Sequence, residues 1–272
     1  MTGYVMRFEE LGRESTAEAG GKGANLGELA RAGLPVPPGF VVTAQAFLSS
    51  MEEAGVRAEL AELQAKAGAA PPEEAAELCA HVRSLVRKAG ISAAVRDAIA
   101  GAYAALAPPG PVAVRSSATS EDTAGTSFAG MNETFTNTWG EAEVLDRVLD
   151  CWTSLYGERV VSYRAGRGVD EEPAIAVVVQ EMVDSERSGV MFTADPSTGD
   201  RGRIIVEGAF GLGEVVVDGQ VEPDTYAVAK DGPRLVEVRV GQKAHKVVRG
   251  ADGHDQRVEL TAEEGGRRVL TD

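Results

Sequence analysis

The chain has 272 residues, of which 43% are hydrophobic, and it carries a formal net charge of −15. This acidic balance disfavours a nucleic-acid surface, and no stretch approaches the roughly 20 apolar residues that span a bilayer. The N-terminus shows no apolar run followed by a cleavage site. We therefore expect a cytoplasmic protein that binds neither nucleic acid nor membrane, with a core large enough for one or two domains.

The N-terminal part of the chain predicts mainly helices after a short opening strand. Residues 40–42 indicate a strand, and Thr43 can cap a helix that runs to about residue 54. The alanine- and glutamate-rich residues 52–76 are typical of a solvated helical flank with little prospect of chemistry. Further helices are expected over residues 73–88, opened by prolines, and over residues 92–106.

The rest of the chain changes from mixed to β-rich. A strand carries Arg115, and an amphipathic helix is expected over residues 141–164, with Trp152 and Tyr156 as core residues. Strands are then expected over residues 174–182, 189–195, 203–210, 224–230 and 234–240. A helical N-terminal part, a mixed central part and a β-rich C-terminal part predict an α/β protein of two lobes.

The cysteines and histidines do not form a metal-binding pattern. Cys79 and Cys151 fall in helix-like segments without CxxC spacing, which favours packed, reduced thiols. His81, His245 and His254 are scattered along the chain. This distribution argues against a zinc site.

Residues 112–136 carry the strongest chemical signal. A strand-like run leads Arg115 into two serines, followed by two acids and small residues around Gly130. A cation at the end of a buried strand, beside hydroxyls and backbone amides, suits a polyphosphate. The SFAG segment indicates a lid that can close over a nucleotide. Alternatively, Arg115 pairs with Glu121 or Asp122 in a solvated turn.

A second candidate for phosphate binding lies near the N-terminus. Lys22 follows two glycines and precedes Gly23, and a helix is expected over residues 25–32. Glycines let a phosphate approach the backbone, and a helix N-terminus favours an anion. The spacing matches neither a Walker loop nor the dinucleotide fingerprint. A glycine-flanked surface lysine without a ligand is the alternative.

Taken together, five segments in this order resemble the ATP-binding domain shared by phosphoenolpyruvate synthase, pyruvate phosphate dikinase and rifampicin phosphotransferase. The segments are GGKGANLGELARAGLPVPPGFVVT, VAVRSSATSED, SFAGMNETF, VVVQEMVDSERSGVMFTADPSTG and GAFGLGEVVVDGQVEPDTY. The likeness runs from about residue 15 to about residue 249. It implies an ATP-grasp-like fold in which two lobes clamp the nucleotide.

The resemblance also implies roles for individual residues. Lys22 and Arg115 match the family's phosphate-binding lysine and arginine, and we expect both to act in phosphoryl transfer. Gly130 and Thr134 match its glycine-rich lid and the hydroxyl behind the lid. Gln180 matches a position beside the adenine at the hinge, although a solvent-facing side chain on an edge strand is an alternative.

Three further residues, Gly211, Gly213 and Glu214, form either a second turn near the phosphates or a tight bend between strands. The resemblance implies ATP and Mg²⁺ as cofactors. We assign no metal ligand, because the family's ligands lie in motifs that this sequence does not contain. Asp195 and Glu207 are acids for which nothing in the sequence indicates a metal-binding role.

We expect residues 1–272 to be one AMP/ATP-binding domain of the dikinase type, incomplete at its C-terminus. Within it, residues 1–108 would form a helical subdomain with Lys22, and residues 109–272 a mixed α/β part with Arg115 and the lid. The expected partners are ATP and the phosphohistidine and acceptor-binding domains of the same longer protein.

The expected activity is that of a dikinase-type phosphotransferase, in which a phosphohistidine passes phosphate from ATP to an acceptor. VEPDTY is most similar to the phosphoenolpyruvate synthase branch, which implies pyruvate as acceptor. Several alternatives stay open: a rifampicin phosphotransferase, the phosphate-dependent dikinase, a non-catalytic ATP-sensing module, an ATP-grasp ligase that releases ADP, and a structural domain.

Overall fold

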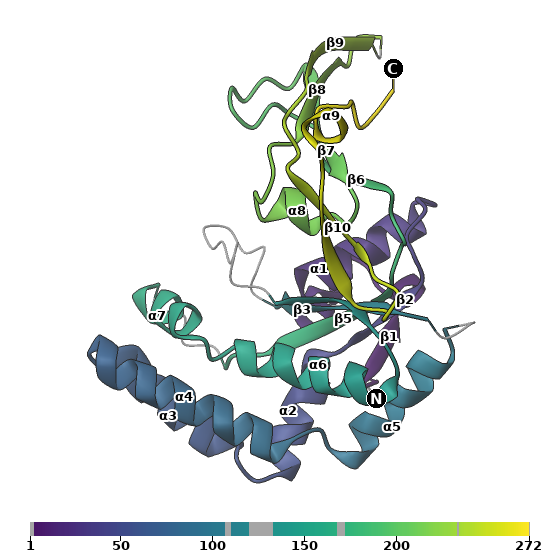
Figure 1. Ribbon diagram of the computed structural model, residues 1–272. Coiled ribbons are helices and arrows are strands. Elements are labelled where there is room, and N and C mark those ends of the chain that lie inside the picture. The colour runs from purple at the N-terminus through teal and green to yellow at the C-terminus, as the bar shows by residue number, and fades with distance from the viewer. Residues whose placement is uncertain (1–2, 107–109, 120–132, 168–171, 233, 272) are drawn as a thin grey trace. The chain divides into compact units, whose positions relative to one another are not determined.

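The computed structural model describes residues 3–106, 110–119, 133–167, 172–232 and 234–271. The chain divides into two compact units, Met1–Met182 and Val183–Asp272 (Figure 1). The first unit contains a five-stranded sheet, and the second contains a four-stranded sheet and a two-stranded hairpin. Each unit is built around its own sheet, so each is described by itself.

The sheet of the first unit has the strand order β1-β2-β5-β3-β4, and every neighbouring pair is antiparallel. Its strands are β1 (Val5–Arg7), β2 (Gly39–Val42), β3 (Val112–Ala118), β4 (Thr134–Thr138) and β5 (Ile175–Glu181). The strand β5 reads as a nearly continuous apolar run and is buried along most of its length. Such a run fits a central strand that is covered on both faces.

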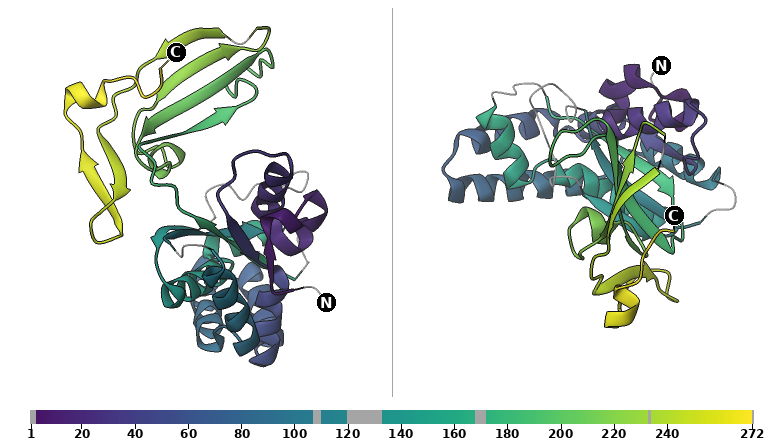
Figure 2. Two further views of the ribbon diagram at one scale, coloured as in Figure 1. Left: turned by 90° about the vertical axis from the view of Figure 1, so that its right-hand side faces the viewer. Right: turned by 90° about the horizontal axis from the view of Figure 1, so that it is seen from above.

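Helices cover both faces of this sheet. They are α1 (Thr16–Arg31), α2 (Ala44–Glu53), α3 (Arg57–Ala69), α4 (Pro72–Ala89), α5 (Ala93–Ala104), α6 (Glu141–Ser154) and α7 (Glu158–Gly166). Val112 and Val114 of β3 belong to the large core that packs against α2, α4, α5 and α6. Val178 of β5 faces the opposite way, toward Ala19 of α1. The helix α1, purple in Figure 2, lies on the other side of the sheet from the blue helices. No helix among the described residues is long and apolar enough to cross a membrane.

The helices expected over residues 43–54, 73–88 and 92–106 are confirmed by α2, α4 and α5. The continuous helix expected over residues 141–164 is wrong. Gly157 has an extended backbone (φ −66°, ψ 143°) and separates α6 from α7. The break lets the chain turn while Trp152 and Tyr156 remain buried, which confirms both as core residues.

The division that the structure shows lies between residues 182 and 183. The predicted boundary between residues 108 and 109 falls inside the first unit instead. The reason is the sheet itself, since β2 pairs with β5, for example Val41 opposite Val178. Strands from both predicted parts therefore share one set of backbone hydrogen bonds and one core.

The second unit is mainly β-structure. Its elements are β6 (Arg187–Phe192), β7 (Arg203–Phe210), α8 (Glu214–Val217), β8 (Asp224–Ala229), β9 (Arg234–Arg239), β10 (His245–Arg249), β11 (Asp255–Glu259) and α9 (Ala262–Gly265). The strands expected over residues 189–195, 203–210, 224–230 and 234–240 are confirmed by β6 to β9. The hairpin of β10 and β11 was not predicted, because its charged strands lack a clear apolar alternation.

A buried ion pair stabilises this unit. Lys243 and Asp224 have no exposed side-chain surface, and the ammonium of Lys243 donates to the Asp224 carboxylate. Lys243 also donates to the carbonyls of Gly241 at 3.0 Å and Arg267 at 2.9 Å. The second carboxylate oxygen of Asp224 accepts from the backbone N–H of Val269 at 2.7 Å. The network thus holds the segment after α9 against β8.

The network sets the charge state of Asp224. Burial alone would raise the pKa of this carboxyl, but hydrogen bonds from Lys243, the Val269 backbone and Tyr226, with the Lys243 charge, outweigh burial and lower the pKa. A lowered pKa contributes stability above the ordinary pKa of the group, and that stability is lost as the pH falls through the lowered value.

We expect Asp224→Asn to lower the free energy of unfolding of the second unit by about 3–5 kcal/mol, because it leaves Lys243 buried without a counter-charge. The free energy of unfolding of the variant should also fall less toward acid pH than that of the unsubstituted chain, because the variant has no carboxylate to protonate at this position. Hydrogen exchange of β7 and β8 amides in urea, between neutral and acid pH, measures both effects.

The matched control is Asp184→Asn, which removes an exposed ion pair with Arg249. It should cost at most about 1 kcal/mol. Equal effects of the two substitutions would contradict the role given to the buried pair.

Candidate functional site

The strand β3 presents Arg115 on the sheet face that α1 covers. Val112 and Val114 point into the large core on the other face, so Arg115, one residue further along, points away from that core. Arg115 lies opposite Val178 of β5 and opposite Thr134 of β4. Directly opposite residues share a face, so Arg115 and Thr134 lie on one face of the sheet.

Gln180 lies on the same face, two residues beyond Val178 on β5. Its partners are Ala113 of β3 and Gly39 of β2, which makes β5 a central strand and excludes the solvent-facing edge alternative. Gln180 is 9% exposed, and its amide nitrogen donates to the Pro37 carbonyl at 3.2 Å. This contact ties the side chain to the segment that leads into β2.

Lys22 is brought to this face by a kink in α1. Gly20 interrupts the helix with φ 68° and ψ 173°, a conformation that favours glycine. The hydroxyl of Ser117 donates to the Ala19 carbonyl at 2.9 Å and accepts from the Gly23 N–H at 3.3 Å. Ser117 therefore bridges the two sides of the kink, and Lys22 lies half-buried between the two bridged residues.

The bridging residue connects the two predicted phosphate-binding segments. Ser117 lies two residues after Arg115 on β3, hence on the same sheet face. The sequence predicted the two serines after Arg115 as hydroxyl donors to a polyphosphate, and it did not predict that the Ser117 hydroxyl bonds to α1. The spacing of two residues between Arg115 and Ser117 could have predicted that they share a strand face. It could not predict the contact with Gly20, which is almost a hundred residues away in the chain.

The structure thus brings Lys22, Arg115, Thr134 and Gln180 to one sheet face, from four different elements. Thr134 is exposed, whereas Arg115 and Lys22 are half-buried. Gly130, the predicted lid glycine, lies outside the described residues. A cation-bearing face with an exposed hydroxyl and a central amide can hold an anionic group at one end and hydrogen-bond a polar ring at the other.

The second unit holds the remaining candidates. Gly211 has φ 80°, and a Cβ there would lie 2.2 Å from the Val247 carbonyl oxygen, so it makes a tight bend against β10. Gly213 precedes α8, which begins at Glu214. Asp195 accepts hydrogen bonds from the N–H groups of Ser197 and Thr198, chiefly the former, which lower its carboxyl pKa within a local turn.

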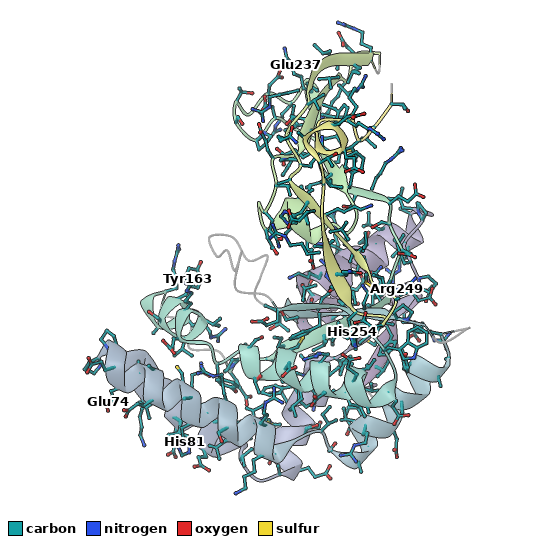
Figure 3. All side chains as sticks on the ribbon, viewed as in Figure 1. Glu74, His81, Tyr163, Glu237, Arg249 and His254 are labelled. Carbon is teal, nitrogen blue, oxygen red and sulfur yellow. The ribbon has the colours of Figure 1, made fainter. Side chains whose placement is uncertain are left out.

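No group of three or more histidine, cysteine, aspartate or glutamate side chains that could hold a metal ion comes together within the described residues. Glu207 lies on β7. Figure 3 shows His81 on α4 of the first unit and His254 at the turn of the β10–β11 hairpin of the second. The residues that the structure describes therefore give no basis for assigning Mg²⁺ ligands.

A cavity of about 630 Å³ in the first unit does not include the four residues on the α1-covered face. It is lined by Phe135, Arg83 and the start of α7, and Phe135 packs against the large core, on the face away from Arg115. We place the candidate site by the sheet register rather than by this cavity. The register relates Arg115, Thr134 and Gln180 on three strands, and the cavity lining includes none of these residues.

Sequence comparison identifies the family of the chain. The sequence model of a family described as "Pyruvate phosphate dikinase, AMP/ATP-binding domain" matches residues 16–272. The chain belongs to this family. The expected ATP-grasp-like α/β fold, with helices in its N-terminal part and sheets in its C-terminal part, is confirmed.

Three relatives of the chain are named as phosphoenolpyruvate synthases or probable ones. The chain is 44% identical over its whole length to a probable phosphoenolpyruvate synthase of Methanothermobacter thermautotrophicus, of which it covers 40%. It is 40% identical over 98% of its length to one of Archaeoglobus fulgidus, covering 36% of that protein. A phosphoenolpyruvate synthase of Aeropyrum pernix is 39% identical over 97% of the chain, and 33% of that protein is covered. The chain thus spans well under half the length of these relatives.

We expect Gly20→Ala to destabilise the first unit by about 3 kcal/mol, because the substitution adds backbone strain and an overpacked contact. The new Cβ would lie 2.3 Å from the Ser117 carbonyl oxygen. Urea unfolding followed by the fluorescence of Trp152, which is fully buried in this unit, measures the loss.

Gly33→Ala is the matched control, since Gly33 has a similar φ of 75° with nothing within 4 Å of its Cβ position. It should cost only about 1 kcal/mol of backbone strain. If both variants lose the same stability, the contact with Ser117 contributes nothing.

Proposed function

We propose that this chain binds ATP on the α1-covered face of the first unit, as the nucleotide-binding part of a phosphoenolpyruvate synthase. The observation that carries the proposal is the common sheet face of Lys22, Arg115, Thr134 and Gln180. The description of the family and the names of the relatives support the same ligand and enzyme.

In this proposal, Lys22 and Arg115 bind the phosphates and stabilise the charge that develops on the transferring group. Phosphoryl transfer requires mainly that a protein positions the reacting groups and supplies positive charge. The bridge through Ser117 supplies the position, because it fixes the Lys22 segment against the strand that carries Arg115. On a chain with a net charge of −15, these local cations provide the attraction for an anion.

Gln180 and Thr134 take the other roles. Gln180 donates to the Pro37 carbonyl, and its amide oxygen would accept a hydrogen bond from the amino group of adenine. Thr134 would bind a phosphate oxygen behind the lid that contains Gly130. Mg²⁺ supplies charge neutralisation between phosphate oxygens when it is bound. We assign it no ligand among the described residues.

The reaction of the full-length protein follows from the same assignment. A histidine on a further domain would take the β- and γ-phosphates of ATP with release of AMP, and water would then release the terminal phosphate as inorganic phosphate. The remaining phosphohistidine would phosphorylate pyruvate, so that ATP, pyruvate and water give AMP, phosphoenolpyruvate and inorganic phosphate. Lys22 and Arg115 would act in the first transfer. The cytoplasm is the compartment we propose for this reaction.

We expect Lys22→Ala and Arg115→Ala each to weaken ATP binding about 10- to 100-fold, because each removes a charged hydrogen-bond donor to a phosphate. Calorimetric titration of the chain with ATP and Mg²⁺ measures the affinity. The unfolding midpoints of both variants should stay near that of the unsubstituted chain.

Lys88→Ala, at an exposed position near the end of α4, changes the net charge equally and should leave ATP affinity unchanged. A large loss of thermal stability in the Arg115 or Lys22 variant, with unchanged ATP affinity, would instead identify a structural ion pair.

Assays of the full-length protein distinguish pyruvate from a rifamycin as the phosphoryl acceptor. With ATP and pyruvate we expect AMP and phosphoenolpyruvate, both detected by chromatography, and we expect no phosphorylation of a rifamycin. Modification of the rifamycin would identify an antibiotic phosphotransferase. ATP binding without AMP formation with either acceptor would identify a sensing module, and release of ADP would indicate a ligase.

A further inference from the structure

Ser116 lies between two residues of β3 that the candidate site uses, but its side chain faces the other way. Arg115 and Ser117 share the face that α1 covers, and adjacent residues of a strand point to opposite faces. Ser116 is paired with Val177 of β5, which belongs to the large core, and it is only 1% exposed. The sequence predicted its hydroxyl as a donor to a polyphosphate, whereas the hydroxyl lies on the face away from the proposed nucleotide.

The Ser116 hydroxyl holds the backbone of Glu133 instead. It accepts a hydrogen bond from the Glu133 N–H at 2.9 Å and donates to the Glu133 carbonyl at 3.4 Å. The backbone N–H of Ser116 donates to the same carbonyl at 3.0 Å. Three hydrogen bonds thus join Ser116 to both polar groups of the Glu133 backbone. Because Glu133 is exposed, these bonds rather than packing fix its place.

Glu133 directly precedes Thr134, the first residue of β4 and the proposed ligand of a phosphate oxygen. Thr134 is exposed, and β4 is an edge strand of the sheet. The end of an edge strand opens more easily than the middle of a sheet. A fixed neighbour therefore restricts the backbone of Thr134 before a ligand arrives, and such preorganisation reduces the entropy that is lost on binding.

We propose that Ser116 is a positioning residue for ATP, which acts through Glu133 on Thr134. The inference rests on the proposed function, because it takes Thr134 as a phosphate ligand. The three consecutive residues 115–117 would then each place one phosphate-binding group. Arg115 contributes its own guanidinium, and each of the two serines holds, on its own face of the sheet, a segment that carries another group.

Calorimetric titration with ATP and Mg²⁺ tests the inference in a double-mutant cycle of Ser116→Ala and Thr134→Val. We expect Ser116→Ala to weaken ATP binding about three- to tenfold, and Thr134→Val to weaken it about tenfold. The double variant should bind ATP no more weakly than Thr134→Val alone, because Ser116 acts through the Thr134 hydroxyl. If Ser116→Ala weakens binding equally in the Thr134→Val background, Ser116 acts in another way and the inference is overturned.

Two further variants separate the hydrogen bonds from packing. Ser116→Cys keeps nearly the size of the side chain but offers only a weak acceptor, so it should weaken ATP binding as Ser116→Ala does. Full ATP affinity in Ser116→Cys would attribute the effect to side-chain volume and overturn the inference. Ser154→Ala removes a hydroxyl that donates to the Cys151 carbonyl within α6 at 2.7 Å, and it should leave ATP affinity unchanged.

Hydrogen exchange measured without ATP tests the contact with Glu133 by itself. We expect the Glu133 amide to exchange at least about tenfold faster in Ser116→Ala than in the unsubstituted chain, since its acceptor is gone. Unchanged exchange would overturn the inference. If the unsubstituted chain does not bind ATP, or Thr134→Val binds ATP with full affinity, the proposed role of Thr134 and the inference fail together. If Thr134→Val weakens binding and Ser116→Ala does not, only the inference fails.

Discussion

The close approach of Gly20 to Ser117 is the constraint on which the candidate site depends. Only a residue without a Cβ can adopt the backbone of Gly20 so near the strand β3. The kink that results lets Ser117 bond to both sides of it. Through this one contact, a lysine in a helix and an arginine in a strand come to one sheet face. Phosphate binding at this face would therefore depend on backbone geometry as well as on charge.

The two units are stabilised by different means. The first unit places a central apolar strand between α1 and the other helices, so hydrophobic burial supplies its stability. The second unit uses a buried ion pair, Asp224 with Lys243, to hold its last segment to the sheet. Such a pair contributes more to a unique geometry than to net stability, since desolvation offsets much of its attraction.

Local charge, not net charge, governs what this acidic chain can bind. Lys22 and Arg115 are half-buried, so their field is screened less than that of exposed lysines.

Much of this protein was predictable from its sequence. Apolar periodicity and capping residues predicted α2, α4, α5 and most strands, and the ordered motifs around Lys22 and Arg115 predicted the family. Local patterns did not reveal the break at Gly157, the sheet that crosses the expected domain boundary, or the role of Ser117. These features depend on contacts between residues far apart in the chain, and on a backbone angle at Gly20 that its neighbours in sequence do not determine. Packing of α1 on β3 in the folded unit decides the backbone angle of Gly20 and the role of Ser117, because Ser117 bonds to both sides of the kink. The break at Gly157 and the sheet that joins β2 to β5 are decided by other contacts of the folded unit.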